Sequence, residues 1–399
     1  MLSQEKNIPL EYHGRSIGAA DYVAAVSAEN VHNIIGPHNV LLQVNYGCYL
    51  HCEMCDRHKW VKEGVPVDET MTTNQLLGLV DELSAMGTRR ITIVGTEPVM
   101  RKDLTLMLGR IRENNIKPEL YTAGIVLSDE LIESILLTST DVAFSLDGFN
   151  ENSHNRIRVP NNEFNAYART LGSIERLTKA RAAKNISQEN VRITANFTIQ
   201  RNNISDLALV TPEQIDLCGL DVLRMSVVHG EGSYALVSED IPIILEFMQR
   251  MKANSSRTEI SFSNALEYLA NNSLTPQDFN VNTLIPSRIA DGTNKLKCHI
   301  AEYSTMIDPK GDVRPCLYLY DDNGSFDSSD RDQFVMGNVK NDSFRAIWNG
   351  EAYTTFRRSK EYPDLKSGSR CRTCEYTDQF EEMDQIIALS KINDIQIGW

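Results

Sequence analysis

Between residues 38 and 235 the sequence alternates short apolar runs with amphipathic segments, and this alternation constrains the fold more than any other feature. The apolar runs predict strands at 39–45, 90–94, 118–122, 141–146, 191–199 and 221–228. The segments between them predict helices near 72–86, 104–114, 129–137, 165–184 and 207–217. Strands separated by helices form parallel sheets with right-handed crossovers. The pattern therefore predicts an α/β fold, either a partial barrel of six strands or an open doubly wound sheet.

Three cysteines, Cys48, Cys52 and Cys55, follow the first predicted strand in the spacing C-x3-C-x2-C. Because they share one loop, their thiolates can hold three irons of a four-iron cluster and leave the fourth iron without a protein ligand. A structural zinc site would need a fourth protein ligand, which His51 or His58 can supply. The spacing favours the cluster, with the closed zinc site as the alternative.

A second group of cysteines lies in the C-terminal part of the chain, at Cys298, Cys316, Cys371 and Cys374. The Pro309–Asp312 segment between the first two has the composition of a hairpin turn. Four thiolates can enclose one iron-sulfur cluster completely, and the same four can also enclose zinc. The sequence therefore predicts a second, closed metal site.

The cysteine triplet resembles the signature of radical S-adenosylmethionine (SAM) enzymes, and the second group resembles the Twitch domain, a shorter relative of the SPASM domain. The resemblance implies a partial (β/α)6 TIM barrel that binds SAM at the C-terminal ends of its strands, followed by a smaller α+β auxiliary-cluster domain. It also implies two [4Fe-4S] clusters and a flavodoxin or ferredoxin-type electron donor. In that family one electron cleaves SAM to a 5'-deoxyadenosyl radical, which abstracts a hydrogen atom from the substrate.

Two further motifs resemble SAM-binding segments of the same family. Gly95-Thr96-Glu97-Pro98 is similar to Gly-Gly-Glu-Pro, whose Glu accepts a hydrogen bond from the SAM ammonium, although Thr96 replaces the second glycine. The Ser-Leu-Asp-Gly turn at 145–148 would point Ser145 toward the ribose or the carboxylate. Relatives carry an arginine after this turn that pairs with the SAM carboxylate by a charge-assisted bond. The resemblance gives these candidate cofactor-binding residues: Met54, Gly95, Thr96, Glu97, Pro98, Thr122, Ser145, Asp147, Arg158 and Asn196.

We expect four parts along the chain: an N-terminal extension (1–37), the radical SAM barrel (38–235), a helical connection that lines the active site (236–297) and the auxiliary domain (298–399). The 40 basic and 54 acidic residues give a net charge of −14, which argues against a nucleic-acid partner held by phosphate contacts. No apolar run approaches the roughly 20 residues that cross a membrane, and no signal peptide precedes residue 17. We therefore expect a cytoplasmic protein with no membrane partner.

The expected reaction follows from a closed auxiliary cluster, which has no position for a substrate and suits electron transfer. Hydrogen abstraction from a carbinol followed by loss of an electron and a proton would oxidise a small carbohydrate-like substrate, such as an aminocyclitol, an amino sugar or a sugar nucleotide. Arg288 and Tyr303 are candidate substrate or acid-base residues. Only about 37 residues precede the first strand, which we take to disfavour a peptide substrate bound by a leader domain.

Three alternatives stay open. The first is an epimerase or rearrangement enzyme in which Cys218 returns a hydrogen atom to the substrate radical. The second is a peptide-modifying radical SAM enzyme. The third is a zinc or electron-transfer protein that performs no catalysis.

Overall fold

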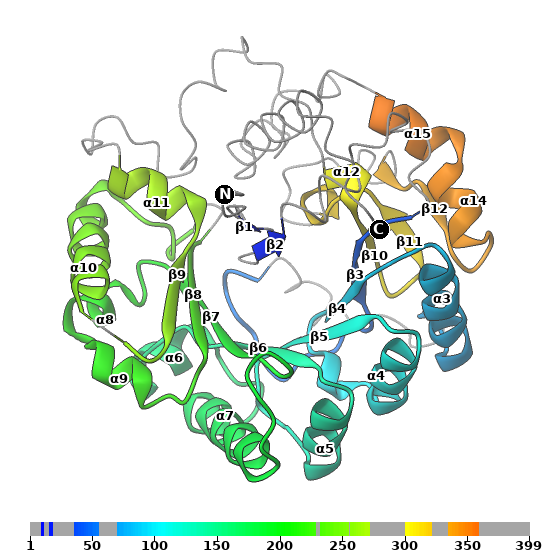
Figure 1. Ribbon diagram of the computed structural model, residues 1–399. Helices are drawn as coiled ribbons and strands as arrows, with labels where there is room; N and C mark the ends of the chain where they lie inside the picture. The colour runs from blue at the N-terminus through cyan, green and yellow to red at the C-terminus, as the bar shows by residue number, and fades with distance from the viewer. Residues whose placement is uncertain are drawn as a thin grey trace, which may run out of the picture.

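The computed structural model describes residues 9–11, 16–18, 36–55, 70–228, 232–254, 256–271, 300–320 and 334–358. Within these residues ten strands form one sheet in the order β12-β11-β10-β3-β4-β5-β6-β7-β8-β9. The sheet curves, and helices cover its convex side (Figure 1). Near the N-terminus, β1 (Pro9–Glu11) and β2 (Ser16–Gly18) form a separate antiparallel pair. None of the described helices combines the length and the apolar character that spanning a membrane requires.

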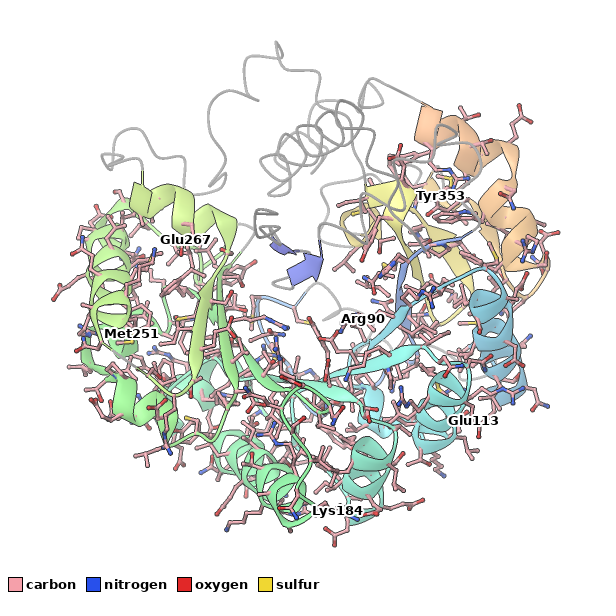
Figure 2. The ribbon with its side chains drawn as sticks, in the orientation of Figure 1. Arg90, Glu113, Lys184, Met251, Glu267 and Tyr353 are labelled. Atoms are coloured by element: carbon pink, nitrogen blue, oxygen red, sulfur yellow. The ribbon has the colours of Figure 1, made fainter. Side chains whose placement is uncertain are left out.

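The curved part of the sheet is a parallel barrel segment in which at least one helix separates each strand from the next. Because every connection is a crossover, the C-terminal ends of these strands all lie at one edge of the barrel. The barrel strands are β3 (Asn39–Gln43), β4 (Arg90–Val94), β5 (Lys117–Thr122), β6 (Asp141–Ser145), β7 (Ile193–Ile199), β8 (Val222–Val227) and β9 (Glu259–Phe262). Figure 2 labels Arg90, where β4 begins.

The barrel helices begin where the sequence provides capping side chains. Thr72 and Gln75 form a capping box at α3, and Ser128 and Asn165 accept backbone N–H groups at the starts of α5 and α7. The helices are α3 (Thr73–Ala85), α4 (Leu104–Glu113), α5 (Asp129–Leu137), α6 (Glu151–Ile157), α7 (Ala166–Ala183), α8 (Ile204–Leu209), α9 (Pro212–Asp216), α10 (Ile241–Ala253) and α11 (Asn264–Asn271). Two 3-10 turns, η3 (Pro98–Met100) and η4 (Ser238–Asp240), lie between them.

Each barrel strand alternates between a face that packs on helices and a concave face. On β4, Ile91 and Ile93 are fully buried in the core that Leu83 of α3 and Ile111 of α4 share. Burial of such side chains stabilises the fold by about 25 cal/mol for each Å² of apolar surface removed from water. The strand residues that alternate with these apolar ones face the concave side of the sheet and are more polar. They include Thr92, Glu119, Ser145, Asn196 and Arg224.

The C-terminal described segment extends the barrel sheet. β10 (Ser304–Ile307) pairs in parallel with β3 and antiparallel with β11 (Asp312–Arg314), which in turn pairs with β12 (Gly337–Asn338). The hairpin expected at Pro309–Asp312 is present, and Gly311 supplies its positive φ of 93°.

Four short helices and turns complete this part of the chain: α12 (Ile300–Tyr303), η5 (Leu317–Tyr320), α14 (Phe344–Asn349) and α15 (Glu351–Arg358). Glu82 of α3 accepts the N–H groups of Phe344 (3.0 Å) and Arg345 (2.9 Å) and so holds the start of α14 against the barrel. Tyr353 of α15, labelled in Figure 2, donates its hydroxyl to the Ser304 carbonyl at the start of β10.

The structure confirms the expected partial barrel and corrects two details of it. The helix expected at 207–217 is two helices, because Pro212 has no N–H to continue α8 and instead begins α9. The connection expected to be helical at 236–297 contains α10 and α11, but it also contributes β9, a further parallel strand beside β8.

Candidate active site

The cysteine triplet lies on the loop that follows β3, at the edge of the barrel where the parallel strands end. Cys52 is buried with Leu50 and Ala123 in a small apolar cluster that Cys48 and Cys55 border. The Leu50 N–H donates to the Cys48 sulfur (3.4 Å), and Nη1 of an arginine donates to the Cys52 sulfur (3.8 Å). Donors of this kind stabilise metal-bound thiolates and tune iron-sulfur clusters.

Burial disfavours the charged form of two of these thiols, Cys48 and Cys52. Burial, with smaller contributions from neighbouring carboxyl and thiol groups, raises the pKa of Cys48 to about 12, and burial raises the pKa of Cys52 to about 11. Among the described residues, no three Cys, His, Asp or Glu side chains converge closely enough to hold a single metal ion. Three thiols on one loop, in the spacing C-x3-C-x2-C, fit an iron-sulfur cluster.

The carboxylate of Glu97 is fully buried directly beside this loop. Its oxygens accept hydrogen bonds from the Thr122 hydroxyl (2.7 Å) and from the Ala123 N–H (2.9 Å). Burial raises the pKa of Glu97 despite these bonds, because a carboxylate without a cation is costly in such a place. A bound ammonium group would remove that cost. Thr122 therefore orients Glu97, a role that the sequence did not assign to it.

The turn that carries Glu97 is tied to the start of the cysteine loop through Asn45. The Asn45 amide donates to the Glu97 carbonyl (2.7 Å), and the Thr96 hydroxyl donates to the Asn45 carbonyl (3.2 Å). A Cβ on Gly95, at φ 151°, would lie 3.2 Å from the Asn45 Oδ1 atom. Thr96 thus adds a cross-link where the resembling motif has a second glycine, and Pro98 begins η3 immediately after Glu97.

Asp147 and Arg158 form a buried pair close to the cysteine loop. Oδ2 of Asp147, which is fully buried, accepts from Arg158 Nε (2.6 Å), and Oδ1 accepts from the Thr198 N–H (2.8 Å). Burial opposes the charge of Arg158, but Asp147 and Cys52 together raise its pKa. Arg158 is the arginine that donates to the Cys52 sulfur.

His154 completes this network as a neutral side chain. Burial, reinforced by the charge of Arg158, lowers the pKa of His154 to about 3, and its Nδ1 accepts the Asp147 N–H (3.3 Å). The Asp147 carbonyl also accepts from the Asn203 amide (3.1 Å). Asp147 therefore holds neighbouring protein groups, and its contact with SAM stays a prediction.

The remaining cofactor candidates lie at or near the concave side of the barrel. Ser145 at the end of β6 is paired in register with Asn196 on β7. Met54 packs, partly buried, against the apolar cluster around Cys52. These positions suit contacts with a nucleoside that spans the strand ends.

Two candidate catalytic residues lie away from this edge. Tyr303 immediately precedes β10, which is parallel to β3, so it lies at the N-terminal edge of the sheet. It is buried there and stacks on His38, with the two ring centroids 4.9 Å apart. Cys218 follows α9 and precedes β8, also at the N-terminal edge, and its thiol donates to the Gln214 carbonyl. The structure thus brings neither side chain to the cysteine loop, and their roles in catalysis stay predictions.

Of the second cysteine group, only Cys316 lies among the residues that the structure describes. Cys316 is partly buried between β11 and η5 and packs against Leu319 and Phe334. Arg288, Cys298, Cys371 and Cys374 lie outside the described residues.

Sequence reasoning overlooked Arg101, four residues after Glu97. Its guanidinium donates to the carbonyls of Val44 (2.9 Å) and Met71 (3.1 Å), on either side of the cysteine loop. No spacing rule signals these bonds, because their acceptors are backbone atoms.

Comparison with known families identifies two domains in the chain. Residues 42–193 match the radical SAM superfamily, and residues 298–375 match SPASM, an iron-sulfur cluster-binding domain. The chain has a radical SAM domain and a SPASM domain. The SPASM match is consistent with the expected Twitch domain, which is a shorter relative of the SPASM domain. The two domains imply SAM and iron-sulfur clusters, including an auxiliary one.

Three similar proteins extend over most of the chain. AdoMet-dependent heme synthase of Methanosarcina barkeri is 23% identical over 345 residues, which are 85% of this chain and 89% of the relative. PqqA peptide cyclase of Xanthomonas campestris pv. campestris is 23% identical over 345 residues, covering 85% and 81%. The crystal structure of Streptococcus suis SuiB bound to S-adenosylmethionine has a TM-score of 0.59 and 13% identity, covering 90% of this chain and 75% of SuiB; SuiB has also been solved bound to its precursor peptide SuiA.

Proposed function

We propose that this radical SAM enzyme removes hydrogen from a C–H bond of a peptide and holds two [4Fe-4S] clusters. The observation that carries the proposal is the placement of the cysteine loop next to the buried carboxylate of Glu97, at the C-terminal edge of the barrel. One group of ligands suits iron and the other suits an ammonium. SAM is the compound that joins the two in this family.

The residues of the chain divide the work of binding. Cys48, Cys52 and Cys55 would hold the SAM-binding cluster, and Glu97, kept in place by Thr122, would accept the SAM ammonium. When bound, the first cluster supplies the electron that cleaves SAM to a hydrogen-abstracting radical, and the auxiliary cluster supplies an acceptor for the second electron of an oxidation.

Other side chains would orient SAM. Arg158 uses Nε for Asp147 and Nη1 for the Cys52 sulfur, so Nη2 stays available for the SAM carboxylate. Ser145 and Asn196, adjacent on β6 and β7, would contact the ribose. Cys316 would hold the auxiliary cluster together with Cys298, Cys371 and Cys374.

The similar proteins favour a peptide over the carbohydrate that the sequence suggested. PqqA peptide cyclase is named for a peptide, and SuiB has been solved with a precursor peptide. Neither these proteins nor the heme synthase are named for a carbohydrate. The heme synthase, which matches over 89% of its length, makes a tetrapyrrole substrate the second candidate.

Anaerobic reconstitution followed by measurement of 5'-deoxyadenosine tests the radical chemistry. With dithionite and SAM we expect product from the native chain and none from Cys52→Ala; equal product from both would refute the cluster assignment.

To test the substrate class, low-molecular-weight extract of the source organism is added to the reconstituted enzyme, and its stimulation of SAM cleavage is measured. Peptidase treatment of the extract should abolish stimulation, and mass spectrometry should find a peptide that has lost two hydrogen atoms. Stimulation that survives peptidase and follows an iron porphyrin or a sugar would overturn the peptide assignment.

A further inference from the structure

The segment that carries the cysteine triplet leaves the barrel at one point and returns at another. It departs after Val44, at the end of β3, and returns at Met71, just before α3. One guanidinium bridges the two points, because Arg101 donates from Nη1 to the Val44 carbonyl (2.9 Å) and from Nη2 to the Met71 carbonyl (3.1 Å). The ends of the segment are therefore held together by a side chain from the turn after β4.

Arg101 is itself held by a carboxylate. Asp103 accepts from Arg101 Nε (2.7 Å) and Nη2 (3.0 Å), and it also accepts the hydroxyl of Thr73 at the start of α3. Both charged side chains are largely buried, at 13% and 15% exposure. Burial alone would raise the pKa of Asp103, but the hydrogen bonds from Arg101 and Thr73 outweigh it and hold the pKa below its ordinary value. The pair is charged at neutral pH and the arginine is fixed in two directions.

Two other parts of the molecule meet at the same point. The Arg101 N–H donates to the Pro98 carbonyl (3.0 Å), in the turn that begins with Glu97. The Met71 N–H donates to the Pro309 carbonyl (2.8 Å), in the hairpin turn between β10 and β11 of the SPASM domain. The guanidinium thus donates directly to both ends of the cysteine segment. The backbone of Arg101 is bonded to the Glu97 turn, and the backbone of Met71 is bonded to the SPASM hairpin.

We propose that Arg101 is a positioning residue that fixes the cysteine loop relative to Glu97 and to the SPASM hairpin, so that the iron site and the ammonium site keep the separation that SAM requires. This inference rests on the proposed binding of a cluster by Cys48, Cys52 and Cys55. It concerns the residues that orient the ligands rather than the ligands themselves, and such outer residues commonly change metal affinity by about 10- to 100-fold.

Arginine is required at this position because the acceptors are spread around a plane. Two carbonyls and both carboxylate oxygens bind one planar fork, whereas a lysine ammonium is a compact donor that cannot reach them together. Arg101→Lys keeps the charge and removes the fork, and Arg101→Gln removes both. Arg110→Lys is the matched control, because Arg110 on α4 also pairs with an aspartate, Asp81 (2.6 Å), but on a half-exposed surface.

The first measurement is the rate at which an iron chelator removes iron from the reconstituted chain. We expect the Arg101 variants to lose iron from the three-cysteine site at least about tenfold faster than the native chain, and Arg110→Lys to match the native rate. The electron paramagnetic resonance change that SAM induces in the reduced cluster should weaken in the Arg101 variants. The KM for SAM should rise more than kcat falls.

The second measurement uses the chain without metal. Amide hydrogen exchange at Leu50 and at Cys55, whose N–H donates to the Cys52 carbonyl (3.1 Å), should accelerate in Arg101→Lys. Free guanidinium ion should partly restore slow iron loss to Arg101→Ala, an outcome that a general loss of stability would not produce.

The outcomes separate this inference from the function on which it rests. A native chain that binds no cluster refutes the proposed function. A native chain that binds the cluster, with Arg101→Lys indistinguishable from Arg110→Lys in iron loss and SAM response, overturns the role of Arg101 alone. Should no Arg101 variant fold, Asp103→Asn, which keeps the side-chain shape, decides the question: iron loss at the native rate in that variant overturns the proposal.

Discussion

Replacement of Asp147 by asparagine separates a structural role from a role in SAM binding. The native carboxylate is fully buried and accepts from Arg158 Nε (2.6 Å) and from the Thr198 N–H (2.8 Å). Removal of one partner of a buried ion pair costs about 3–5 kcal/mol. Asparagine keeps one acceptor oxygen, so we expect the lower end of that range, about 3 kcal/mol.

Thermal unfolding of the metal-free chain measures this loss. A domain of about 200 residues loses roughly 2–4 °C for each kcal/mol, so Asp147→Asn should lower the first unfolding transition by roughly 6–12 °C. Arg158→Gln is the partner variant. The double variant should be less destabilised than the sum of the two single variants, because the second change removes the charge that the first leaves unpaired.

The competing interpretation makes a different prediction. Were Asp147 a SAM contact, as the sequence suggested, the unfolding transition of Asp147→Asn would stay within about 2 °C of the native value, a shift of less than 1 kcal/mol. The KM for SAM would rise instead. That pair of results would refute the structural role.

Three further changes test other parts of the molecule. Gly95→Ala places a methyl group 3.2 Å from Asn45 Oδ1 at φ 151°, so the KM for SAM should rise about tenfold in a 5'-deoxyadenosine assay, whereas Gly109→Ala, with open space around it, should leave the KM unchanged. Asp216→Asn removes a carboxylate whose pKa is lowered to about 2, because its hydrogen bonds outweigh the effect of burial. Above pH 4 the free energy of unfolding of the native chain should exceed that of the variant by about 2 kcal/mol. This difference should vanish in acid-unfolding curves as the pH falls through 2. Cys218→Ala should keep the native kcat, and loss of turnover would restore its role as hydrogen donor.

The sequence predicts the barrel well because its strands are long apolar runs bounded by capped helices. The strand at β4 is predicted at its observed bounds, Arg90–Val94, and the other five lie within about two residues. β9 was missed because Glu259–Phe262 has four residues, two of them polar, among neighbours without a strand-like pattern. Its place in the sheet depends on pairing with β8, which is a long-range contact.

The sequence narrows the choice of site residues most where the chemistry fixes the residue type. Three thiols on one loop have few uses, and the glutamate of a Gly-x-Glu-Pro turn after a strand is placed by the topology. The sequence also predicts SAM contacts for polar side chains such as Thr122 and Asp147, which in the structure are hydrogen-bonded to Glu97 and Arg158. Sequence cannot distinguish these partners, because both lie within reach of the same strand end.

The topology of the sheet places Tyr303 and Cys218 away from the cysteine loop. In a parallel sheet, a residue just before a strand lies at the edge opposite to the loops that follow the strands. Tyr303 precedes β10 and Cys218 precedes β8. For Cys218 the predicted strand at 221–228 already placed it at that edge; for Tyr303 the argument required the pairing of β10 with β3, which no sequence pattern shows.

That pairing also determines how the two domains are coupled. Ser304–Ile307 lies in register with Asn39–Leu42, so the SPASM hairpin is bonded to the strand that delivers the cysteine loop. Movement of the hairpin relative to the loop would break the ladder between β10 and β3 and the bond from Met71 to Pro309. The hairpin and the loop therefore form one framework, held by the ladder between β10 and β3 and by the bond from Met71 to Pro309.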